Sequence, residues 1–356
     1  MNRDKKFLPK KDLLQPQLIR VGVSHACNHR CVMCWNYSAM LKEQKSDHWK
    51  NVMAEKEMLL NVIAEAKEIG FKQILFSGRG EPFTHPNILD FIRMAVQKRL
   101  GVILQTNLSL VDPIILADVL KNLKQRSIIC VNLSAAEQNT YDKIHNQAGK
   151  NEFISILDKI KYLRNKKIRV RYVFVVIKQN YREIEEAFAL NDNLETFLHL
   201  ELADYASGKG VGKLAITKRM ENEIGGKLSL IKKKYNTKNS NIDDFSDQLT
   251  YRGIGARQIY SCLIGNNFCS IDETGKVHYC FNMESDDYYM GNLTNNTLKQ
   301  IWSSDKYNLM RSKLRKGDFL PGCKQYCLPR YSTSKPRGSN FKLRFFIDKR
   351  MPKPYA

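Results

Sequence analysis

The chain contains no run that approaches the roughly 18 consecutive apolar residues of a membrane-spanning helix. Its N-terminal segment is charged and lacks the apolar core of a signal peptide. These absences predict a cytoplasmic protein with no membrane partner, in which cysteines stay reduced and cysteine clusters bind metal more often than they form disulfides. No RNA-binding signature is present either, so nucleic acid is not an expected partner.

Acidic residues are scarce, because 36 Asp and Glu stand against 58 Lys and Arg and give a formal net charge of +22. Such a surface attracts anions, including phosphorylated small molecules, acidic peptides, anionic lipids and nucleic acids. A lysine- and asparagine-rich composition without functional meaning explains the charge equally well. Charge alone therefore leaves the partner open.

Strand and helix patterns alternate from residue 18 to about 205. The apolar strand segments are 18–24, 72–78, 102–108, 127–134, 168–177 and 196–202. Between them, Gly70 is placed to end one helix, and Asp112 and Pro113 are placed to begin another. Six such units fall short of the eight that close a full barrel. The sequence therefore predicts an α/β fold built on a partial (β/α)₆ TIM-like barrel.

Composition divides the chain into five parts. They are an N-terminal arm (1–17), the barrel (18–205), a basic linker or cap (206–257), a small cysteine-rich unit (258–330) and a basic tail (331–356). We expect the linker to have some helical character.

The loop after the first predicted strand reads "CNHRCVMC" and holds Cys27, Cys31 and Cys34. Barrels of this kind place their chemistry at the carboxyl ends of their strands. Three thiolates suit a [4Fe–4S] cluster with one iron open to another ligand. A zinc site is the alternative and needs His25 or His29 as its fourth ligand, but neither spacing is typical of a zinc finger or ribbon.

The motif C-x₃-C-x₂-C followed by an aromatic residue, here Trp35, resembles the signature of the radical S-adenosylmethionine (radical SAM) enzymes. The resemblance implies that the open iron chelates SAM and that Trp35 belongs to the cofactor site. It also implies reductive cleavage of SAM to a 5′-deoxyadenosyl radical, which abstracts a hydrogen atom from the substrate. The implied partners are SAM, a small-molecule substrate, and a reducing electron donor such as flavodoxin or ferredoxin.

The stretch "FSGRGEPFTHP" lies at the end of the second predicted strand. In the family that it resembles, a Gly-Gly-Glu-Pro-type stretch at this point contacts the amino group of SAM. Gly80, Glu81 and Pro82 match it, whereas Arg79 stands where the family usually has glycine. From the residues alone, Glu81 is equally suited to cap a helix.

The stretch "VNLSAAEQNTYDKIH" resembles the fourth strand of the family together with the segment after that strand. Ser134 matches a serine near the methionyl group or ribose of SAM. His145 stands where the family often has arginine, and the resemblance implies a contact with SAM there as well. Ordinary packing is the alternative for Ser134, as it is for Trp35.

The C-terminal cysteines resemble the ligand pattern of the SPASM domain, or of its shortened form, Twitch. Cys262 and Cys280 flank a hairpin turn that we expect at Gly275, and the resemblance implies that Cys323 and Cys327 complete a four-thiolate site. One auxiliary cluster would bring the total to two [4Fe–4S] clusters. A zinc ion in the four-thiolate site is the alternative.

Two cysteines remain. Cys130 lies within a predicted strand and suits a buried structural thiol. Cys269 lies between two predicted ligands and is open to three roles: a further ligand, a packed thiol, or a hydrogen-atom donor. An epimerase needs such a donor, whereas a dehydrogenase does not.

The resemblance implies an oxidoreductase of dehydrogenase or epimerase type that acts on a sugar, an aminocyclitol or a phosphorylated small molecule. The positive charge is compatible with an anionic substrate. Modification of a ribosomal peptide or protein is the alternative, although few residues precede the first strand and we expect no leader-binding domain there. A non-enzymatic iron–sulfur carrier is the alternative from a different class, and the carboxylate of Glu81 in a SAM-binding stretch argues against it.

Overall fold

The computed structural model describes residues 15–146, 149, 151–203, 211–250, 264–280, 289–316 and 318. Nine strands form one sheet in the order β6-β5-β4-β3-β2-β1-β7-β8-β9. The strands are β1 (Leu18–Gly22), β2 (Gln73–Ser77), β3 (Gly101–Thr106), β4 (Ile128–Asn132), β5 (Arg169–Val176), β6 (Phe197–Leu202), β7 (Phe268–Ile271), β8 (Lys276–His278) and β9 (Tyr289–Asn292). Strands β1 to β6 pair in parallel, which confirms the partial barrel.

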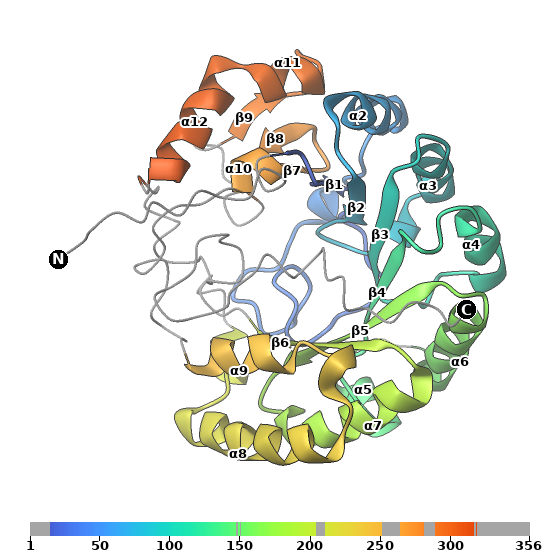
Figure 1. The fold of residues 1–356 in the computed structure, drawn as a ribbon, viewed down its shortest axis with the longest axis vertical. Coiled ribbons are helices and arrows are strands. Elements are labelled where there is room, and N and C mark those ends of the chain that lie inside the picture. The colour runs from blue at the N-terminus through green and yellow to red at the C-terminus, as the bar shows by residue number, and fades with distance from the viewer. Residues whose placement is uncertain are drawn as a thin grey trace.

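Helices surround the outer side of the curved sheet, as Figure 1 shows. The helices of the described residues are α1 (Asp47–Lys50), α2 (Lys56–Ile69), α3 (Ile88–Gln97), α4 (Pro113–Leu120), α5 (Gln138–Ile144), α6 (Glu152–Asn165), α7 (Ile184–Leu194), α8 (Lys218–Lys234), α9 (Ile242–Thr250), α10 (Ile264–Asn267), α11 (Leu298–Ser303) and α12 (Asp305–Lys316). Gly70 ends α2 with a φ of 101°. Asp112 caps α4 by accepting hydrogen bonds from the backbone of its first turn, with Pro113 as the first helical residue. Both helix-boundary predictions are confirmed.

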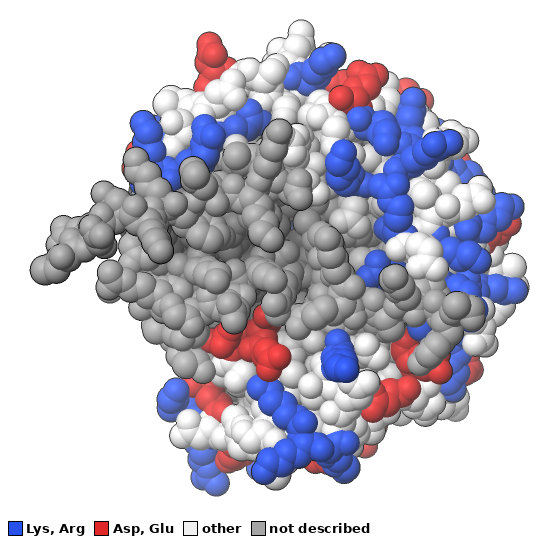
Figure 2. All heavy atoms as spheres, in the orientation of Figure 1, with Lys and Arg blue, Asp and Glu red and all other residues white. Residues whose placement is uncertain are grey.

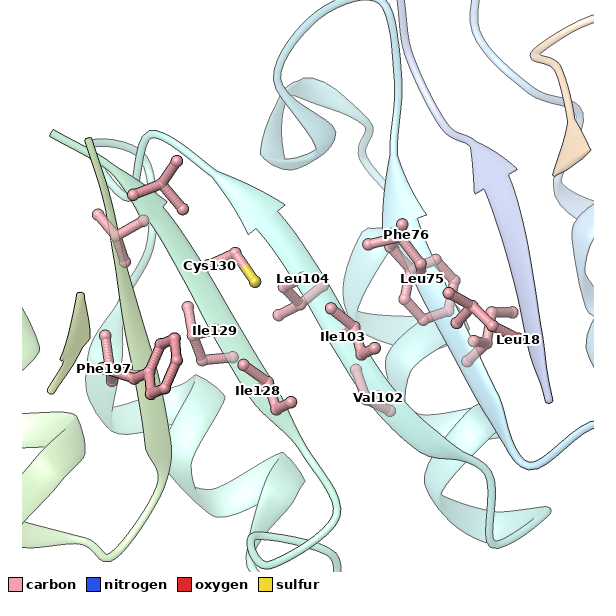
Figure 3. Packing of buried hydrophobic residues seen from close by; sticks show 14 of the residues in the cluster. Leu18, Leu75, Phe76, Val102, Ile103, Leu104, Ile128, Ile129, Cys130 and Phe197 are labelled. Atoms are coloured by element: carbon pink, nitrogen blue, oxygen red, sulfur yellow. The ribbon is translucent and has the colours of Figure 1, made fainter. Parts of the chain in front are cut away.

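The main core lies between the sheet and the helices. Apolar side chains from neighbouring strands pack in rows, and Figure 3 labels Cys130 of β4 among the buried residues. Its register partners are Gln105 and Arg171, so Cys130 lies on the same face of the sheet as these two residues. Cys130 is only 5% exposed, so the prediction of a buried structural thiol is confirmed. In the part of the chain that the structure describes, no helix is long and apolar enough to cross a membrane.

Part of the expected linker packs on the barrel edge. Asn241, just before α9, accepts a hydrogen bond from the Leu200 backbone N–H through its side chain and donates one to the Leu200 carbonyl oxygen, at 2.7 and 2.9 Å. Ile242 and Phe245 of α9 are buried, while α8 continues the outer layer of helices beyond α7. This segment therefore covers the edge of the sheet at β6.

The C-terminal unit continues the barrel sheet. β7 pairs in parallel with β1, and β8 and β9 follow it in antiparallel pairs. Gly275 has a φ of 83° in the turn between β7 and β8, which confirms the predicted hairpin. Cys280 follows β8 and is buried, whereas Cys262, Cys323 and Cys327 lie outside the described residues. The four-thiolate auxiliary site thus stays a prediction.

Candidate active site

The three cysteines of the β1 loop lie together at the carboxyl end of the sheet, each half-buried. Backbone N–H groups point at two of the sulfurs, from His29 to Cys27 and from Asn36 to Cys34, each at 3.4 Å. Burial raises the pKa of the Cys27 thiol to about 12 and also raises the pKa values of the Cys31 and Cys34 thiols. Thiolates withdrawn in part from water are stabilised by a bound cation, and a donor set of soft sulfurs fits an iron–sulfur cluster.

The C-terminal end of α5 and the residues after it are hydrogen-bonded to the cysteine loop. Arg30 N–H donates to the Asn146 carbonyl oxygen at 2.8 Å, and Val32 N–H donates to the Ile144 carbonyl oxygen at 2.9 Å. These backbone bonds hold the chain on both sides of Cys31. The position of one sulfur is therefore fixed by residues more than a hundred positions away.

His145 belongs to this support. Its Nδ1 lies 3.1 Å from Cys31 Sγ, and its Nε2 lies 2.7 Å from the Leu133 carbonyl oxygen. The ligand atoms of His29, Cys31 and His145 lie within 4.8 Å of one another. The sequence placed His145 at SAM, whereas the structure brings it against a cysteine sulfur. A contact with SAM stays a prediction.

The Gly80 loop runs in backbone contact with the cysteine loop. Gly80 N–H donates to the Ser24 carbonyl oxygen at 2.9 Å, and Glu81 N–H donates to the Ala26 carbonyl oxygen at 2.7 Å. A Cβ atom on Gly80 would lie 2.0 Å from the Ala26 oxygen. Only glycine allows this approach, which explains why a glycine precedes the glutamate here.

Glu81 follows β2, is buried, and forms hydrogen bonds with the end of β3. Its carboxylate accepts hydrogen bonds from Thr106 Oγ1 at 2.6 Å, Asn107 N–H at 2.7 Å and Phe83 N–H at 3.2 Å. Burial raises the pKa of Glu81 to about 7, although these hydrogen bonds act to lower it. The last of them caps the short 3₁₀ helix η2 (Pro82–Thr84). The capping role is thus present, and a contact with SAM stays a prediction.

The buried carboxyl of Glu81 should give the cluster-free protein a distinctive pH dependence. Its pKa rises from an ordinary value of 4.5 to about 7 on folding. The protonated, neutral Glu81 therefore makes its full contribution to the free energy of unfolding below pH 4.5. This contribution is lost as the pH rises through about 7. The stability of wild type relative to Glu81→Gln should fall by a few kcal/mol between about pH 5 and pH 8, at about 1.4 kcal/mol per pKa unit. Urea unfolding of both proteins across this range measures the difference, and a difference independent of pH would contradict the expectation.

Ser134 and Trp35 occupy contrasting positions. Ser134 is fully buried with a φ of 47°, and its Oγ donates to Asn132 Oδ1 and accepts from Val175 N–H. It therefore joins the ends of β4 and β5. Trp35 is 42% exposed beside Cys34. Their contacts with SAM stay predictions, and the buried hydroxyl of Ser134 is already engaged by the protein.

The inner face of the sheet carries polar side chains among apolar ones. The register of the parallel strands places a set of polar side chains on one face, because alternate residues of a strand point to the same side. They are Arg20, Gln105, Asn132, Arg171, His199 and Glu201. Gln105 is exposed although β3 lies inside the sheet, and helices cover the outer face in Figure 1. This polar set therefore faces the barrel interior, which is accessible at Gln105.

Cys269 lies on the opposite face of the sheet. Cys269 pairs with Ile19, and the next pair along the two strands, Arg20 with Ser270, points to the inner side. It is completely buried beside Tyr307 and Arg311 of α12. Burial raises the pKa of its thiol to about 12, against the opposing effects of these two residues.

Two family models match the chain. The model described as the radical SAM superfamily matches residues 21–190, and a model described as an iron–sulfur cluster-binding domain, SPASM, matches residues 262–328. The chain belongs to the radical SAM superfamily. As a radical SAM enzyme with a SPASM domain, it uses [4Fe–4S] clusters and SAM as cofactors, and the β1 cysteine loop has the donor set that the first cluster requires.

The similarity of this radical SAM enzyme to its relatives extends over most of its chain. It is 24% identical over 326 residues to the AdoMet-dependent heme synthase of Methanosarcina barkeri, covering 86% of this chain and 87% of the relative. SuiB of Streptococcus suis, solved with its precursor peptide SuiA, has a TM-score of 0.63 at 15% identity, covering 84% of this chain and 67% of SuiB. The AdoMet-bound structure of anSMEcpe has a TM-score of 0.62 at 17% identity, covering 93% and 94%. Both structures support the fold.

Sequence reasoning missed one group of residues at this site. Arg79 contacts Glu273 in the turn between β7 and β8, and Glu273 also lies 3.2 Å from His25. The signal in the sequence was the arginine in a position where the family usually has glycine. Its partner was hidden, because an acidic residue in a hairpin turn is ordinarily exposed.

Proposed function

We propose that this radical SAM enzyme oxidises a small polar molecule of the sugar, aminocyclitol or phosphorylated class. When bound, SAM and its cluster supply the radical that removes a hydrogen atom from the substrate. The observation that supports this substrate class is the set of polar side chains on the inner face of the barrel, with Gln105 exposed there. The sheet contributes Arg20, Asn132 and Glu201 to the same face, all half-buried.

The charge of the protein supports an anionic member of this class. Figure 2 shows Lys and Arg side chains gathered along one side of the visible face, over the region of α3 and α4. Long-range attraction toward such a surface raises the association rate of anions. A phosphorylated substrate should therefore bind less tightly as ionic strength increases.

The position of Cys269 supports dehydrogenation over epimerisation. A hydrogen-atom donor must reach the substrate radical, and Cys269 is fully buried on the side of the sheet that faces away from the barrel interior. This position supports the role of a packed thiol for Cys269 over that of a hydrogen-atom donor. Dehydrogenation needs no donor, because the auxiliary cluster can accept the second electron from the substrate radical.

Anaerobic incubation with candidate substrates tests the proposal. The reconstituted, reduced enzyme is mixed with SAM and with neutral sugars, aminocyclitols or phosphorylated sugars, and release of 5′-deoxyadenosine and loss of two hydrogens from the substrate are followed by mass spectrometry. Stoichiometric oxidation of one small-molecule class is the expected result. Turnover of a peptide in place of every small molecule would favour the alternative of peptide modification. Absence of SAM cleavage with both clusters intact would favour the iron–sulfur carrier.

A further inference from the structure

The carboxylate of Glu273 is buried between the two loops of the SAM site. The residue lies in the turn between β7 and β8 and is 3% exposed. Its Oε1 accepts a hydrogen bond from the Arg79 backbone N–H at 2.8 Å, and its Oε2 accepts another from the Arg79 guanidinium. One carboxylate therefore binds both the main chain and the side chain of Arg79.

Two glycines make room for this carboxylate. A Cβ atom on Gly22, at the end of β1, would lie 2.6 Å from Glu273 Cδ. A Cβ atom on Gly78, just after β2, would lie 3.1 Å from Glu273 Oε1 and 2.6 Å from the Ser24 carbonyl oxygen. The ends of the first two barrel strands thus form a recess that only a pair of glycines permits, and Glu273 fills it.

The same carboxylate touches the start of the cysteine loop. Glu273 Oε2 lies 3.2 Å from His25 Nε2, and His25 precedes Cys27 by two residues. The His25 carbonyl oxygen accepts a hydrogen bond from the Tyr37 hydroxyl at 2.6 Å, on the far side of the cysteines. Contacts of one acidic side chain thus reach both the loop that holds the cluster and the Gly80 loop.

The charges at this contact are complementary. Burial alone would raise the pKa of Glu273, but His25, Arg79 and Arg20 together hold it below its ordinary value, so the carboxylate stays ionised. Arg79 Nη2 also lies 4.0 Å from Asp272 Oδ2. A buried ion pair contributes little unless its geometry is satisfied, but removing one partner leaves the other charge buried and uncompensated.

We propose that Glu273 is a positioning residue by which the SPASM-matched segment sets the affinity of the barrel for SAM. Through Arg79 it holds the backbone of Gly80 and Glu81, and through His25 it holds the entry to the cysteine loop. We call these contacts the Arg79–Glu273 clasp. This inference rests on the SAM chemistry of the family and is independent of the substrate class proposed above.

The test compares Glu273→Gln, Arg79→Gly and the double variant as reconstituted holoenzymes. The dissociation constant of SAM is measured by equilibrium binding, together with iron content and the change that SAM produces in the EPR spectrum of the reduced cluster. We expect each single variant to bind SAM about tenfold or more weakly, which is about 1.4 kcal/mol. The double variant should be no weaker than the poorer single variant, because both substitutions break the same contact. Iron content should remain that of wild type.

Glu65→Gln is the matched control. Glu65 of α2 also accepts a hydrogen bond from the C-terminal unit, from Lys299 N–H at 2.8 Å, but at an exposed position. The SAM affinity and the EPR spectrum of the Glu65→Gln variant should match those of wild type. Unchanged SAM affinity in Glu273→Gln, or additive losses in the double variant, would overturn the clasp. Loss of auxiliary iron in Glu273→Gln would also overturn it, because Glu273 would then serve the fold of the C-terminal unit. None of these readouts requires the substrate, so they leave the proposed function untouched.

Discussion

Alanine at Cys27, Cys31 and Cys34 together should abolish SAM cleavage and lower the iron content of the reconstituted enzyme from about eight to about four atoms per chain. The physical reason is that these three free cysteines are the predicted protein ligands of the first cluster, and their removal takes away its thiolates. Only the auxiliary cluster should remain. Iron analysis and 5′-deoxyadenosine release under strong reductant measure both effects.

Cys130→Ala provides the matched control for this triple variant. Cys130 is also a buried cysteine, but it lies within β4, between Gln105 of β3 and Arg171 of β5, and away from the cysteine loop. Its removal should cost only about 1–2 kcal/mol of stability, as a small buried side chain does, and should leave iron content and SAM cleavage intact. Wild-type SAM cleavage by the triple variant would contradict the assignment of the cluster site.

Gly80→Ala should have the second largest effect. The added Cβ would lie 2.0 Å from the Ala26 carbonyl oxygen and 2.3 Å from the His25 carbonyl oxygen, and both contacts are with backbone. Since neither atom can move without moving the cysteine loop, the two loops must separate, at a cost of about 1–3 kcal/mol or more. We expect a lower melting temperature, loss of about four irons and SAM binding weakened by two orders of magnitude or more, on the order of 3 kcal/mol.

Gly225→Ala is the control for Gly80→Ala. Gly225 lies within α8, and a Cβ atom there would meet no atom within 4 Å. Alanine in a helix interior is favoured over glycine by about 0.5–1 kcal/mol, so this variant should be slightly more stable than wild type. Equal melting temperatures and equal iron content for Gly80→Ala and wild type would contradict the expected collision.

Local rules account for the parts of the fold that the sequence predicted well. Gly70 and Asp112 act within one helical turn, and Gly275 acts within one hairpin, so each could be placed without its surroundings. The cysteine spacing likewise predicted a three-thiol loop. The parallel pairing of β7 with β1 was not predicted, because strand order depends on contacts between distant residues.

Side-chain partners at the site show the same division. Glu81 was found by its position in a motif. Two of the hydrogen bonds that its carboxylate accepts come from Thr106 of β3 and from Asn107, the residue after β3. His145 was assigned to SAM by analogy with arginine, but the structure places it against Cys31. Glu273 gave no sign in the sequence, because its burial depends on the recess at the ends of β1 and β2.

The pairing of β1 with β7 has a consequence for biosynthesis. Leu18 aligns with Phe268, so one edge of the first strand waits for a partner that is made about 250 residues later. At a translation rate of about 5–20 residues per second, that interval is on the order of ten seconds or more. Until β7 emerges, β1 presents unpaired N–H and C=O groups at an open edge, where other chains can add. The nascent barrel should therefore depend on chaperone protection until its C-terminal strands are made.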